Sequence, residues 1–96
     1  MLNTAKINLS KHVLKRYEPE INNGTYFFYN AKNQKFYTTD YQIGSIIDSL
    51  DGKISLKEIS NIIHQNNIHL NKADLESFLN DLFNELYLEG FVVELD

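Results

Sequence analysis

The sequence predicts a small α+β domain in which a short antiparallel sheet of two or three strands precedes three α-helices. Two observations predict this class. The first is a pair of segments rich in β-forming residues, 25–29 (TYFFY) and 35–39 (KFYTT), joined by a short polar stretch. The second is the region 41–93, where apolar residues recur with helical spacing in three successive segments.

The first 24 residues carry the weakest signals. Residues 1–10 have little hydrophobic patterning, so we expect them to be flexible and loosely held. Residues 12–21 are ambiguous, because their alternation would suit a strand and Pro19 would then lie at a strand edge or end. The stretch Asn22-Asn23-Gly24 indicates a turn.

The segments 25–29 and 35–39 are expected to form a hairpin closed by the loop 30–34. Side chains alternate between the two faces of a strand, so both faces carry aromatic residues. One face is expected to join the core. The other is either a tyrosine-rich surface partly covered by the N-terminal arm or part of a docking surface.

The first helix is expected to begin after a cap at Thr39 or Asp40 and to end at the turn dipeptide Asp51-Gly52. The second begins at Ser55, which forms a capping box with Glu58. Ile54 and Ile59 occupy the positions of a hydrophobic staple around that cap. The apolar stripes of these helices are Ile43, Ile46, Ile47 and Leu50 in the first, and Leu56, Ile59, Ile62 and Ile63 in the second.

The third helix is expected to begin after Asn71 as its N-cap, with Leu70 and Leu75 as a second staple, and to end at Gly90. Residues 91–95 then form a short strand or an extended tail. The apolar stripe of the third helix is Leu75, Phe78, Leu79, Leu82, Phe83 and Leu86, and we expect Phe78, Leu79 and Leu82 to lie in the core.

Length and composition predict one domain over residues 1–96, since 43% of the residues are hydrophobic. The chain has no cysteine, which suits a reducing cytoplasm, and no apolar run typical of a signal peptide or membrane span. The net charge is −4 and unevenly distributed. Residues 71–96 hold seven acidic residues and one lysine, a balance of −6, whereas residues 1–70 sum to +2.

Candidate catalytic and metal-binding residues form no recognisable set. His12, His64 and His69 lack the spacing of a metal site, and no serine lies in a nucleophile elbow. Asp81 and Glu85 are one helical turn apart, but paired acid–base catalysis needs buried carboxylates, and we expect these two to lie on a solvated face opposite the apolar stripe. We therefore expect neither an enzyme, nor a bound metal, nor a cofactor.

One family resembles this chain in the order of its motifs. A hydrophobic helix closes on Leu50-Asp51-Gly52, a capped helix follows with ISLKEI at 54–59, and a long helix carries FLNDL at 78–82 before EGFV at 89–92. This order resembles the PqqD family, also called precursor-peptide recognition elements, and covers about half the chain by motif. The strands 25–29 and 35–39 extend the resemblance, although they carry no motif that aligns residue by residue.

The resemblance implies a winged helix-turn-helix-like fold and a non-catalytic role in the cytoplasm. In such domains the leader of a ribosomally made precursor peptide adds as a strand to the sheet, beside the third helix, and the domain presents it to a modifying enzyme. That enzyme is a radical SAM protein in the PqqD case, or one of a cyclase or protease type. The strand-edge residues implied here are Lys35, Phe36, Tyr37, Thr38 and Thr39, and the groove residues on the third helix are Asp74, Leu75, Phe78, Asp81, Leu82 and Glu85.

Two other functions remain open at this point. A winged helix could serve a transcriptional regulator, in which the third helix enters the DNA major groove. The acidic residues of that helix oppose this, because they would repel phosphate, and we expect neither nucleic acid nor membrane as a partner. A general protein–protein adaptor is the second alternative.

Overall fold

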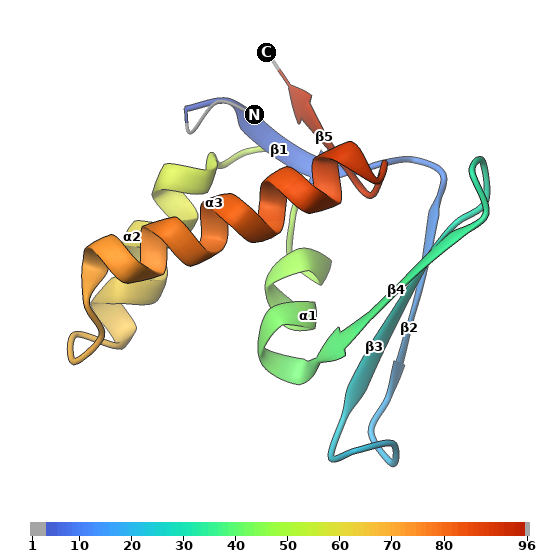
Figure 1. Cartoon of the computed structure of the whole chain (residues 1–96), viewed down its shortest axis with the longest axis horizontal. Helices are drawn as coiled ribbons and strands as arrows, with labels where there is room; N and C mark the ends of the chain where they lie inside the picture. The colour runs from blue at the N-terminus through green and yellow to red at the C-terminus, as the bar shows by residue number, and fades with distance from the viewer. Residues whose placement is uncertain (1–3, 96) are drawn as a thin grey trace.

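The computed structural model describes residues 4–95, which form five strands and three helices in an α+β arrangement (Figure 1). The predicted class is therefore confirmed at this level. In chain order the elements are β1 (Lys6–Leu9), β2 (Val13–Glu18), β3 (Thr25–Asn30), β4 (Lys35–Asp40), α1 (Tyr41–Asp48), α2 (Leu56–Asn66), α3 (Lys72–Leu88) and β5 (Val92–Leu95).

The strands form two separate antiparallel sheets, which differs from the single N-terminal sheet expected from the sequence, so the expected winged helix-turn-helix arrangement is not matched in detail. One sheet has the order β2-β3-β4, and the other pairs the first strand, β1, with the last, β5. In the second sheet Ile7 lies opposite Glu94 and is fully buried. Residues 6–9 are thus part of the core structure, whereas the sequence predicted a loosely held segment; residues 1–3 lie outside the described part of the chain.

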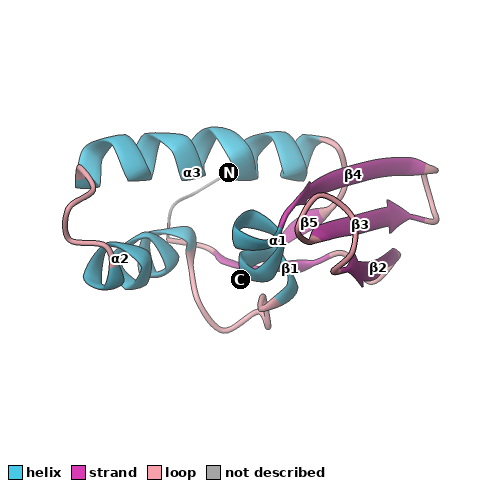
Figure 2. Cartoon of the chain, turned by 90° about the horizontal axis from the view of Figure 1, so that it is seen from below, coloured by secondary structure: helices cyan, strands magenta, loops and turns pink. Residues whose placement is uncertain are grey.

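The three-stranded sheet places one row of side chains inward. Tyr26 and Phe28 of β3 are buried, and their rings stack at a centroid distance of 5.8 Å. α1 packs against this inner face, where it contacts β3 and β4 (Figures 1 and 2). Gly44 permits the close approach, because a Cβ there would come within 2.2 Å of the Tyr26 ring.

Each helix begins at the cap that the sequence predicts. The side chain of Asp40 accepts a hydrogen bond from the Ile43 amide, and Ser55 forms the complete capping box of α2. Asn71 caps α3. α3 ends in a Schellman motif at Gly90, whose φ is +87°, and the Phe91 N–H donates to the Leu86 carbonyl at 2.8 Å.

The core gathers side chains from both sheets and all three helices. α3 contributes Leu79, Phe83 and Leu86, all nearly inaccessible. The expectation that Phe78 lies in the core is wrong, because its side chain is 52% exposed, and Leu82 is only partly buried. The buried apolar residues are Ile7, Tyr26, Phe28, Ile47, Leu50, Leu56, Ile59, Leu79, Phe83, Leu86, Phe91 and Val92.

Candidate functional site

β4 is an edge strand, and within residues 4–95 only β3 pairs with it. One backbone contact fixes which of its groups face the open side. His12 and Ala31 are the next opposed residues after Val13 and Asn30, where the β2–β3 register ends. The Ala31 N–H donates to the His12 carbonyl at 2.9 Å, so these two residues form a hydrogen-bonded pair. Hydrogen-bonded and non-bonded pairs alternate in an antiparallel ladder, so odd-numbered residues of β3 bond to β2 and even-numbered ones bond to β4.

This alternation divides the residues of β4 into two sets. Lys35, Tyr37 and Thr39 lie opposite the even-numbered residues of β3, so their backbone groups complete the ladder. The N–H and C=O groups of Phe36 and Thr38 consequently point to the open edge. An extended peptide could bond to these groups without disturbing the sheet.

One side of α3 faces β4. Phe78, Leu82, Glu85 and Glu89 follow one another at spacings of four, three and four residues, which places them on one stripe of the helix. At the end of this stripe Glu89 forms an ion pair with Lys35 of β4. In Figure 2, β4 is the strand of the three-stranded sheet that lies nearest to α3.

Side-chain amides fasten the β3–β4 loop to the end of α3. Asn33 donates to the Glu89 carbonyl at 2.9 Å, and Asn30 donates to the Gly90 carbonyl at 2.8 Å. Asn30 is 3% exposed, so this bond satisfies a buried amide. The orientation of β4 relative to α3 is therefore set by specific contacts.

Charge on this side of the molecule is mainly negative. Burial raises the pKa of the Tyr37 hydroxyl, the hydrogen bond with Thr39 acts in the opposite direction, and the charge of Glu85 raises the pKa further. Tyr37 therefore remains a neutral hydrogen-bonding group at physiological pH. Asp81 and Asp74 are exposed on the adjacent row of α3, so this side of the helix favours a peptide with basic residues.

An apolar hollow of about 480 Å³ opens where α1, α2 and α3 meet, at the end of the stripe marked by Phe78. Its volume is sufficient for one or two large side chains of a bound peptide. It lies next to the end of β4, because Tyr41 follows that strand directly. The lining residues are Tyr41, Gln42, Ile43, Ser45, Ile46, Ile63, Asn67, Leu70, Leu75, Phe78 and Leu79.

The structure brings part of the predicted site together. Tyr37 of β4 lies close enough to Glu85 for that charge to raise its pKa, and Leu75 and Phe78 line the apolar hollow. Sequence reasoning missed the contribution of α1, which supplies Tyr41 and Ile43. The available signal was a large apolar residue, Tyr41, at the first position of a helix that directly follows an edge strand.

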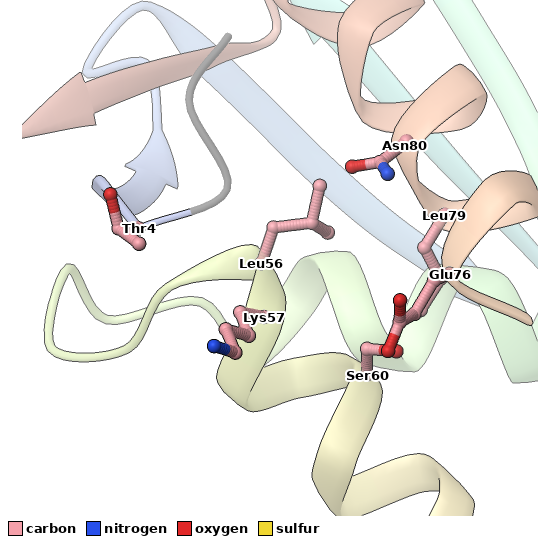
Figure 3. Close-up of a pocket in the computed structure, with 7 residues that line it drawn as sticks. All are labelled: Thr4, Leu56, Lys57, Ser60, Glu76, Leu79 and Asn80. Carbon is pink, nitrogen blue, oxygen red and sulfur yellow. The ribbon is translucent and has the colours of Figure 1, made fainter. Parts of the chain in front are cut away.

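A second hollow, of about 380 Å³, lies between α2 and α3 (Figure 3). The Ser60 hydroxyl is buried there without a hydrogen-bond partner among the described residues. Glu76 and Asn80 of α3 also line the hollow, but no histidine among the lining residues could activate the serine. A serine within a helix can turn its hydroxyl to the carbonyl four residues earlier, so this arrangement does not indicate a catalytic site.

Among residues 4–95, no three histidine, aspartate or glutamate side chains are grouped so that they could hold a metal ion, and none of the helices is long and apolar enough to cross a membrane. No protein-family model matches the chain, and neither the curated proteins nor the solved structures that were searched include a match.

Proposed function

We propose that this chain is a PqqD-like, non-catalytic peptide-binding protein that presents a ribosomally made precursor peptide to its modifying enzyme. The leader of the precursor adds to β4 as a further strand and lies beside α3. The enzyme served is of the radical SAM type or of a cyclase or protease type, in the cytoplasm. In this proposal β2–β4 and the three helices serve as the winged-helix-like body, and the β1–β5 sheet, which pairs the first strand with the last, departs from the expected N-terminal sheet.

The observation that carries the proposal is the open edge of β4 beside α3. The outward backbone groups of Phe36 and Thr38 supply affinity that tolerates sequence variation, as in other cases of strand addition. The alternating side chains of the leader face either α3 or solvent. Those that face α3 meet Leu82 and Glu85, and the apolar hollow is available to a large side chain at one end.

The charge of α3 favours this function over DNA binding. Asp74, Asp81 and Glu85 are exposed on this helix, and contacts with phosphate would be repulsive. The same charges suit a leader with lysine or arginine near the docked segment. Because such contacts are exposed, each contributes less than about 1 kcal/mol and weakens as salt is added.

A binding titration tests the proposal. The probe is a fluorescently labelled precursor peptide encoded beside the gene for this chain, and the control is the same peptide with a scrambled leader. We expect saturable binding at one peptide per chain, which is lost when the leader is removed or scrambled. Equal binding of the scrambled control would contradict the proposal, and tight binding of duplex DNA with a steep salt dependence would favour a regulator instead.

A further inference from the structure

An apolar row crosses the outer face of the three-stranded sheet, on the side away from α1. The register places Leu14 of β2 opposite Tyr29 of β3, and Tyr29 opposite Phe36 of β4. The rings of Tyr29 and Phe36 lie 4.5 Å apart between centroids. Leu14 is 64% exposed and Phe36 is 72% exposed, so this outer row remains largely accessible.

Phe36 combines two properties that no other residue of β4 has. Its side chain ends the outer row, and its backbone N–H and C=O point to the open edge. In an added strand, the residue directly across from Phe36 exchanges backbone hydrogen bonds with it and places its side chain on the same face. That side chain lies against the exposed side of the Phe36 ring, whose other side already contacts Tyr29.

We infer that the bound peptide is recognised from both sides of the added strand, and that its residue beside Phe36 is aromatic or β-branched and apolar. This inference rests on the proposed strand addition and specifies its ligand. The residues on either side of that position face α3, where the exposed carboxylate of Glu85 favours a basic side chain. The recognised sequence is therefore an apolar residue flanked by a basic one. If the protein contacted only the face of the added strand that points to α3, the residues on the outer face of that strand would be polar.

The contact with Phe36 should make binding depend on the peptide residue beside it. A cross-strand aromatic or β-branched pair is a modest contact, which in affinity amounts to a factor of about 2 to 10. The outer row needs no rearrangement to receive it, since Phe36 is already held by Tyr29. Loss of the Phe36 ring should therefore weaken binding measurably while the backbone contacts persist.

A library of random nine-residue peptides displayed on yeast tests the inference with the full chain as the selecting protein. We expect the wild type to enrich peptides with an aromatic or β-branched residue next to a basic one. Phe36→Thr keeps a strand-forming residue but removes the ring, so it should bind the enriched peptides about 2- to 10-fold more weakly and lose the aromatic preference. Phe36→Tyr should preserve the preference.

Leu14→Thr provides a matched control, because it changes the far end of the same outer row without touching the β4 edge. It should leave the enriched sequences unchanged. If Phe36→Thr selects the same peptides as the wild type, or if Leu14→Thr abolishes the preference equally, the inference is overturned. Concentration-dependent self-association that Phe36→Thr removes would also overturn it, because the outer row would then bind a second copy of this chain.

Thr38→Pro separates this inference from the proposed function. It removes an outward N–H while leaving the outer row intact, so it should abolish binding of every enriched peptide. If Thr38→Pro abolishes binding but Phe36→Thr has no effect, strand addition stands and recognition by the outer row fails. If no selected peptide depends on Thr38, or none is enriched, both fail.

Discussion

Because neighbouring residues of β4 direct their N–H groups to opposite sides, we expect proline to affect fold stability differently at two adjacent positions. Tyr37 directs its N–H into the sheet toward β3, whereas Thr38 directs its N–H to the open edge. Proline lacks that N–H and fixes φ near −65°, which an edge position tolerates and an internal ladder position does not. Tyr37→Pro should therefore destabilise the fold, and Thr38→Pro should not.

The magnitude follows from the contacts of each residue. Tyr37→Pro removes a ladder hydrogen bond and leaves the Phe28 carbonyl without its partner, which costs about 1–3 kcal/mol. It also removes a half-buried ring that lies 6.4 Å from the Phe28 ring and 6.0 Å from the Phe91 ring, which adds about 1.5–2.5 kcal/mol, half the cost of a fully buried aromatic. The total is a large part of the roughly 5–15 kcal/mol available to a domain of this kind.

Urea unfolding followed by circular dichroism measures both effects. Tyr37→Thr serves as the control for the side chain, so that the difference between threonine and proline at this position isolates the backbone contribution of about 1–3 kcal/mol. Thr38→Pro, at an exposed position, should lower the free energy of unfolding by less than about 1 kcal/mol. If Thr38→Pro destabilises as much as Tyr37→Pro, the deduced register of hydrogen bonds in β4 is wrong.

Three further predictions concern the core. Ile7→Ala should cost about 2–5 kcal/mol in urea unfolding, because Ile7 is fully buried; a small cost would show that β1 is not part of the core. Phe83→Ala should cost about 3–5 kcal/mol and Phe78→Ala, at an exposed position, much less; equal costs would reverse the assigned helix face. Burial and the neighbouring charge of Asp48 raise the pKa of Tyr26, so its stabilising contribution is complete below pH 10 and is lost as the pH rises further. Tyr26→Phe should flatten that alkaline loss in pH-dependent unfolding.

Signals confined to a few neighbouring residues were predicted well from the sequence. The caps at Ser55 and Asn71 and the stop at Gly90 depend on local hydrogen bonds, and each occurs where its motif indicates. The hairpin of β3 and β4 follows from alternating β-formers around a short loop. Such features carry their cause within the segment itself, so a single sequence reveals them.

Features that depend on distant partners were not predicted. β1 is four residues long and is fixed by β5, so residues 6–9 give little indication of a strand on their own. Phe78 shares the apolar stripe of α3, but Leu79, Phe83 and Leu86 already fill the core-facing side. The apolar hollow likewise requires α1 and α3 to meet. For the candidate site, the sequence did not indicate that α1 contributes Tyr41 and Ile43 to the apolar hollow.

The most direct measurement of the proposed strand addition is a set of backbone amide chemical shifts recorded while the precursor peptide is added. Strand addition predicts the largest changes at residues 35–39, with those of Phe36 and Thr38 greatest because their amides face the peptide, and further changes along the Phe78–Glu85 side of α3. Changes confined to α1 and α2, with residues 35–39 unaffected, would contradict strand addition even if the peptide binds.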